Sequence, residues 1–148
     1  MTKLEEFLAN TPFTTERKVY WGEMDAMQHV NNTQYFRYFE DLRTDFSEQQ
    51  TSKVQSPEFN PVVAEINCRF LAAIHYPDLL YLGLSIEHIG NSQVIHRYDI
   101  FSTQQSAVVA TGVARMVNID LASGKKQTLP DTHKALFAKF MKPEAREQ

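Results

Sequence analysis

The decisive stretch of this sequence is DAMQHVNNTQY, residues 25–35. It gathers one carboxylate, one imidazole and two amides at the point where a strand-like segment, Arg17–Glu23, gives way to a helical pattern. In that segment the apolar side chains of Val19 and Trp21 lie two residues apart, which is the period of a strand. Junctions of this kind collect ligands and reactive groups, because the first N–H groups of a helix have no partner inside it. We therefore predict that residues 25–35 carry the chemistry.

Downstream of this stretch, the spacing predicts one long helix that begins at Thr33. Its apolar side chains are separated by 4, 3 and 4 positions, which puts them on one helical face: Tyr35, Phe39, Leu42 and Phe46. The opposite face carries charged side chains, at Arg37, Asp41, Arg43 and Asp45. Phe36 and Tyr38 widen the apolar surface beyond a single stripe. We therefore expect a helix that is covered on most sides.

Four further segments alternate with the two-residue period of strands, at residues 62–71, 80–86, 93–101 and 108–119. Turn residues separate the first three, at Tyr76-Pro77-Asp78 and Gly90-Asn91-Ser92. Short helices are predicted near both ends, at Lys3–Leu8 and at Thr132–Met141, the second capped by Asp131. This order predicts an α+β fold in which an antiparallel sheet of five to six strands wraps around the long central helix.

Length and composition exclude several classes of protein. The 148 residues suit one domain spanning residues 1–148, since domains commonly contain about 100–150 residues. A net charge of −3 gives no overall basic field, so no nucleic-acid partner is expected. A single cysteine, Cys68, excludes an internal disulfide, and the lack of a secretory signal or a spanning apolar stretch predicts a cytoplasmic protein with no membrane partner. No histidines and acids show metal-ligand spacing, so neither a metal nor a cofactor is expected.

The sequence resembles the hotdog-fold acyl-thioester hydrolases of the 4-hydroxybenzoyl-CoA thioesterase type. The likeness rests on the pattern Asp25-x-x-x-His29-Val30-Asn31-Asn32-x-x-Tyr35, on Glu40 in the following helix, and on the strand and turn at Phe70–Asp78. It extends from Thr15 to Ile119. The signatures of dehydratase relatives, His followed by Pro-Gly or Asp-x-Asn-Pro-x-His, do not occur. The chain departs from many relatives at Gln28, where they have glycine.

The resemblance implies that Asp25 either attacks the thioester carbonyl or activates the attacking water. An alkyl thiol has a pKa of about 8.5, so the leaving group departs as a thiolate without a strong general acid. The alternative is that Asp25 only stabilises the loop through backbone hydrogen bonds. The resemblance also places the oxyanion at a backbone N–H near Asn32. His29 would orient a side chain, hold water or contact the acyl group, or serve only as a loop histidine.

Four residues are candidates for substrate binding, and each has a structural alternative. Trp21 would line the acyl pocket or belong to the core, and Tyr35 would present a hydroxyl to the pocket or simply pack. Asn31 would contact the substrate or only cap the helix. Arg69 would meet phosphates or be a solvated surface charge. Glu40 would support the reactive turn or form an ion pair along its own helix.

The resemblance further implies a homodimer or homotetramer, in which sheet edges pair and the acyl-CoA substrate lies at the seam between two chains. Two other functions remain open at this point. A non-catalytic module would bind an acyl thioester without turnover, and a carrier-protein thioesterase would need a basic surface for its acidic partner. Composition does not choose between an aliphatic and an aromatic acyl group.

Overall fold

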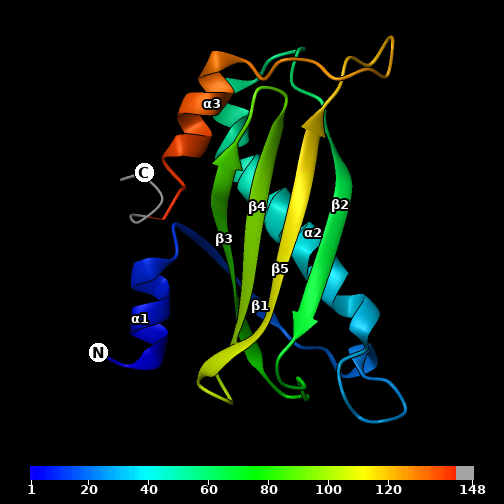
Figure 1. Ribbon diagram of the computed structural model, residues 1–148. Coiled ribbons are helices and arrows are strands. Elements are labelled where there is room, and N and C mark those ends of the chain that lie inside the picture. Colours follow the sequence, from blue (N-terminus) through cyan, green and yellow to red (C-terminus); the bar gives the residue numbers. More distant parts are fainter. Residues whose placement is uncertain (143–148) are drawn as a thin grey trace.

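The centre of the molecule is helix α2, Asn32–Gln49, which lies across one face of a curved sheet (Figure 1). The computed structural model describes residues 1–142, so the last six residues of the expected domain lie outside the described part. Helix α2 begins one residue before the predicted start. Asn31 caps it, because its side-chain oxygen accepts a hydrogen bond from the Thr33 N–H at 2.9 Å.

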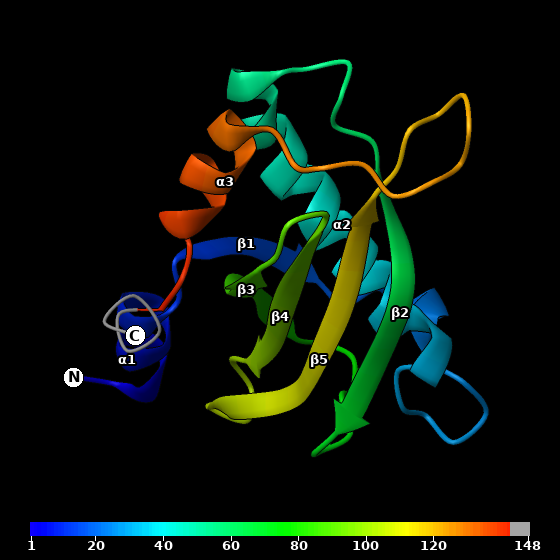
Figure 2. The ribbon, with the colours of Figure 1, turned by 45° about the horizontal axis from the view of Figure 1, so that its top comes forward.

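The described part of the chain forms one five-stranded antiparallel sheet with the order β1-β3-β4-β5-β2. The strands are β1 Phe13–Lys18, β2 Pro61–Phe70, β3 Leu79–Ile89, β4 Gln93–Ser102 and β5 Ala107–Asn118. The sheet curls around α2 (Figure 2). This is the predicted α+β architecture, and the four later strands lie where the two-residue period predicts them.

The predicted first strand is wrong in its position. Strand β1 ends at Lys18, and Trp21–Glu23 forms a 3₁₀ turn, η1, in place of the end of the expected strand. The cause is the buried side chain of Glu23, which accepts a hydrogen bond from the Tyr20 N–H at 2.7 Å and pairs with Arg17 at 2.9 Å. The Tyr20 N–H thus donates to a side chain and not to a neighbouring strand, and the chain turns at this point.

Three shorter helical elements accompany α2: α1 Lys3–Asn10, η2 Thr51–Val54 and α3 Asp131–Ala138. The expected cap at Asp131 is wrong. Asp131 is the first residue of α3, Pro130 occupies the cap position, and the cap has no side-chain hydrogen bond. The fixed φ of proline and its free carbonyl, which accepts from the N–H groups of His133 and Lys134, start the helix instead. The helix also ends three residues before the predicted Met141.

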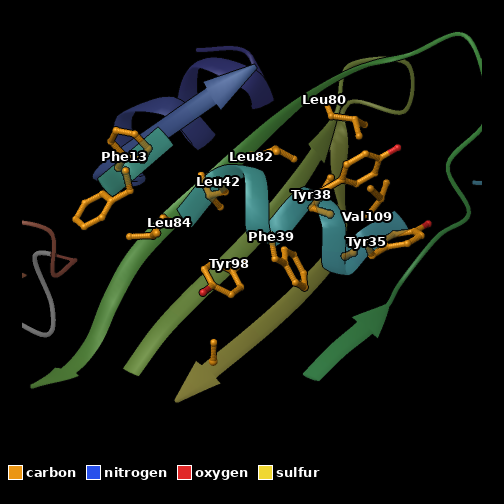
Figure 3. Packing of buried hydrophobic residues seen from close by; sticks show 14 of the residues in the cluster. Phe13, Tyr35, Tyr38, Phe39, Leu42, Leu80, Leu82, Leu84, Tyr98 and Val109 are labelled. Carbon is orange, nitrogen blue, oxygen red and sulfur yellow. The ribbon is translucent and has the colours of Figure 1, made fainter. Parts of the chain in front are cut away.

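The core lies between α2 and the concave face of the sheet. Phe39 stacks on Tyr98 with ring centroids 4.7 Å apart, and both side chains are almost fully buried (Figure 3). Gly112 on β5 makes room for this pair, since a Cβ atom there would lie 2.6 Å from the Phe39 ring. Gly112 therefore faces the helix, and the lack of a side chain at this position lets α2 approach β5 closely.

The opposite face of the sheet is covered unevenly. Helix α1 lies over β3 and β4, where Phe7 contacts Phe101 at 5.2 Å between ring centroids and approaches Gly83. Strand β2, at one edge, has no such cover there, and Val62 is 41% exposed. None of the helices within residues 1–142 is long and apolar enough to span a membrane.

Candidate active site

The turn between η1 and α2 is tightly held by its own backbone. The Asp25 N–H donates to the His29 carbonyl at 2.8 Å, and the Gln28 N–H donates to the Asp25 carbonyl at 2.9 Å. Gln28 adopts a φ of +62°, in the left-handed region where glycine is the usual residue. The turn is therefore closed at the position where many relatives have glycine, and this chain achieves it with a larger residue.

The Asp25 carboxylate is half-buried and only partly used by the turn. Its Oδ1 accepts a hydrogen bond from the Met27 N–H at 2.9 Å. Within residues 1–142 neither a hydrogen bond to Oδ2 nor an ion pair to this side chain is found. The loop-stabilising role is thus real, but it leaves one carboxylate oxygen available.

The first residues of α2 complete the site. The Asn31 side chain caps the helix. The backbone N–H of Asn31 donates to the Glu23 carbonyl at 2.9 Å. The Asn32 N–H precedes the first hydrogen bond of the helix, and no acceptor for it is found among the described residues. An exposed donor therefore stands at the positive end of the helix dipole.

The carboxylate and this donor open into one cleft of about 420 Å³. The predicted residues Asp25, His29, Asn32 and Tyr35 line one side, and residues 70–73, at the end of β2, line the other. Tyr35 is almost fully buried, and its ring lies 4.7 Å from that of Phe70. Burial raises the pKa of the Tyr35 phenol, so the side chain faces the cleft as a neutral hydroxyl-bearing ring.

The other predicted residues lie away from this cleft in the single chain. Trp21 sits on η1 and is 73% exposed, so it does not belong to the core of this chain. Arg69 is exposed on β2. Glu40, also exposed, pairs with Arg37 one turn earlier on α2 at 2.9 Å, which is the ion-pair alternative considered for it.

Sequence reasoning missed two supports of the turn. The His75 ring lies edge-on to His29 with centroids 4.8 Å apart, and its Nδ1 is 3.2 Å from the Gln28 carbonyl oxygen. Behind the turn, the Glu23 carboxylate accepts from the Tyr38 hydroxyl at 3.1 Å. Burial and the charge of Glu23 both raise the pKa of the Tyr38 phenol. In the sequence, the one indication of this network is an acidic residue, Glu23, within the strand-like segment Arg17–Glu23. The sequence around His75 gives no indication of its role.

Known proteins are similar to this chain in both sequence and fold. The family model of the thioesterase-like superfamily matches residues 19–137. The chain belongs to this superfamily. It is 29% identical over 117 residues to the long-chain acyl-CoA thioesterase FadM of Escherichia coli, covering 78% of this chain and 89% of FadM.

Two solved structures place the architecture among the hotdog thioesterases. YbaW of Escherichia coli, described as a probable thioesterase, matches with a TM-score of 0.76 and 25% identity over 87% of this chain and 98% of YbaW. Slr0204 of Synechocystis, a 1,4-dihydroxy-2-naphthoyl-CoA thioesterase, matches with a TM-score of 0.73 and 21% identity over 84% of this chain and 94% of that one. The fold is therefore the hotdog fold, as predicted, and membership of the superfamily supports thioester hydrolase activity.

Proposed function

We propose that this protein hydrolyses an acyl-CoA thioester to the free acid and CoA at the cleft beside Asp25. One observation carries the proposal: a carboxylate and a backbone N–H open into the same cleft, and among residues 1–142 one carboxylate oxygen and that N–H have no hydrogen-bond partner. FadM, a relative by sequence, is named for long-chain acyl-CoA hydrolysis, which supports a CoA thioester as the substrate class.

In the reaction we propose, a carboxylate oxygen of Asp25 attacks the thioester carbonyl carbon. A C–O bond forms, the C–S bond breaks, and its electron pair leaves with sulfur as the CoA thiolate. Water then hydrolyses the resulting mixed anhydride, which releases the acid and restores the carboxylate. In the alternative route, Asp25 takes a proton from water as the water attacks.

The oxyanion of either route is assigned to the Asn32 N–H. A preorganised donor of this kind contributes about 2.7–4 kcal/mol to the transition state. The dipole of the 18-residue helix α2 adds positive potential at the same point. His29, exposed at the rim, is assigned to contact with the substrate, and the buried Tyr35 to the wall of the acyl pocket.

We also propose that two chains pair through β2 and complete the cleft between them. Edge strand β2 exposes apolar side chains on both faces, including Val62 and Val63, and an exposed apolar edge favours pairing with another chain. The end of β2 lines the cleft at residues 70–73, so pairing at this edge would bring a second chain close to Asp25. The side chains of Trp21 and Arg69, which are exposed in the single chain, would then contact substrate in the paired assembly.

The test of the reaction is a panel of acyl-CoA substrates of different chain length and aromaticity. We expect turnover by the wild type and a loss of about a thousandfold or more in kcat for Asp25→Asn. Asp131→Asn, the same chemical change on remote α3, serves as the control and should keep full activity. Equal rates for wild type and Asp25→Asn, or no hydrolysis by either, would refute the proposed role of Asp25.

The two routes differ in where oxygen from water is incorporated. In a single turnover with excess enzyme in oxygen-18 water, attack by Asp25, followed by attack of water on the Asp25 carbonyl of the mixed anhydride, puts the label into the protein carboxylate. Mass spectrometry of the peptide carrying Asp25 detects it. Attack by water puts it only into the product acid.

Pairing is tested by sedimentation of Val63→Asp, which should shift the assembly toward monomer. Leu121→Asp, a change at a 73% exposed loop residue, provides the control.

A further inference from the structure

Helix α3 lies near the other end of α2 (Figure 2). Side chains of both helices line a second pocket there, among them Phe46 and Phe137. Its volume is about 230 Å³, and its walls are mainly apolar, made by Phe46, Phe59, Val94, Met116 and Phe137. An apolar cavity of about 150 Å³ is large enough to hold benzene. We call this space the distal pocket; it is large enough for an aromatic ring or a medium-length alkyl chain.

A chain of polar groups reaches the wall of the distal pocket. The Arg43 guanidinium donates to the Tyr98 hydroxyl at 3.3 Å, and this hydroxyl lies 2.9 Å from Nδ1 of His96. Because burial and the Arg43 charge lower the pKa of His96 to about 3, its ring is neutral at physiological pH. We assign the ring proton to Nε2, the tautomer in which the Tyr98 hydroxyl accepts from Arg43 and donates its own proton to Nδ1.

One hydrogen-bond donor and one positive charge are therefore unmatched at this wall among residues 1–142. No acceptor for His96 Nε2–H is found among residues 1–142, although the side chain is only 6% exposed. Arg43 forms none of the ion pairs in this part of the chain, and none of the residues that line the distal pocket is acidic. A guanidinium beside an apolar pocket is well suited to a carboxylate, which it can bind with charge-assisted hydrogen bonds.

We propose that the distal pocket binds a small carboxylic acid whose body is an aromatic ring or a medium-length alkyl chain. The carboxylate accepts hydrogen bonds from Arg43 and from His96 Nε2–H, because both side chains line this pocket. The apolar body of the acid contacts the phenylalanine side chains. The ligand thus supplies the negative charge and the acceptor that the protein lacks there.

The distal pocket is separate from the cleft beside Asp25. The two share no lining residue. Asn32 and Phe46 are fourteen residues apart on α2, which is about 21 Å along the helix axis. Phe39, whose ring stacks on that of Tyr98, lies between these two residues on the helix. Thioester hydrolysis releases a carboxylic acid, so the reaction product is a natural source of the ligand; this last step alone rests on the proposed function.

The test is calorimetric titration with octanoate and benzoate, and with the neutral octanol and benzyl alcohol as matched ligands. We expect saturable 1:1 binding of at least one acid by the wild type, and binding weaker by about tenfold or more for its neutral counterpart. Arg43→Gln should lose a similar factor, whereas Arg37→Gln, an exposed arginine on the same helix, should not. Circular dichroism and urea unfolding establish that each variant is folded.

Two further variants distinguish the distal pocket from the cleft beside Asp25. Val94→Phe fills the distal pocket and should abolish binding, whereas Asp25→Asn should bind the acid as tightly as wild type. Absence of saturable binding by either acid, equal affinity in Arg43→Gln, or loss of binding in Asp25→Asn would overturn the proposal. Binding is measured without turnover, so an inactive protein that binds the acid refutes the proposed function alone, and an active protein that does not bind it refutes this inference alone.

Discussion

The two ends of helix α2 differ in how they can hold negative charge. At the N-terminal end, backbone N–H groups and the helix dipole favour an anion, and the Asp25 side chain lines the cleft there. At the C-terminal end the dipole opposes an anion, and a guanidinium and a neutral imidazole stand at the pocket wall instead. The C-terminal end of a helix has negative potential and no free backbone N–H groups. An anion can therefore bind there only if side chains supply the hydrogen-bond donors and the positive charge.

The largest effect on stability is expected from truncating Phe39, which lies between the two ends of α2. Phe39→Ala deletes the fully buried ring that stacks on Tyr98, and the resulting cavity should lower the free energy of unfolding by about 3–5 kcal/mol. Urea denaturation measures this loss. Phe36→Ala, which truncates a 37% exposed ring on the same helix, should cost much less. Similar losses for the two variants would mean that Phe39 is not the centre of this core.

The second largest effect is expected from the hydrogen bond behind the turn that carries Asp25. Tyr38→Phe removes the hydroxyl that donates to the buried Glu23 carboxylate, and should lower the free energy of unfolding by about 1.5–3 kcal/mol. Tyr76→Phe makes the same chemical change at a 47% exposed side chain and should be nearly neutral in the same urea titration. An unchanged free energy of unfolding in Tyr38→Phe would show that the turn does not need this hydrogen bond.

The distal end should respond to acid. The pKa of His96 is about 3 in the folded protein and about 6.5 in the unfolded chain, so the unfolded chain takes up the proton first as pH falls. The stabilisation by neutral His96 is complete above pH 6.5 and is lost progressively toward pH 3, by about 2 kcal/mol at pH 5.

Urea unfolding at pH 7.5 and pH 5 measures this effect. His96→Phe, which keeps a ring but cannot titrate, should lose correspondingly less stability on acidification. Burial also lowers the pKa of His133, which adds a contribution of the same sign in both proteins. Equal losses in wild type and His96→Phe would assign the acid response to other groups.

The smallest effect is expected at the turn itself. His75→Phe removes the hydrogen bond to the Gln28 carbonyl, and a less well-positioned Asp25 should lower kcat by about tenfold with little change in KM. Steady-state kinetics on the best substrate of the acyl-CoA panel measure both constants. His88→Phe, at an exposed position on β3, is the matched control. A changed KM with unchanged kcat would instead place His75 in substrate binding.

The sequence by itself determined the long helix, the four later strands and the place of the candidate site along the chain. Helical spacing from Tyr35 to Phe46, the alternation of the later strands and the capping residue Asn31 all act over a few residues, so they can be recognised locally. The same local pattern placed Asp25 and Asn32 beside the start of the long helix.

The tertiary structure alone decided which distant residues support these elements. It turned Glu23 from a strand residue into a buried acceptor, brought His75 to the Gln28 carbonyl, and assembled the distal pocket around Arg43 and His96. These contacts follow from the strand order β1-β3-β4-β5-β2, which departs from the order along the chain. Residues far apart in sequence meet only through that order and its register, and local periodicity contains no information about either.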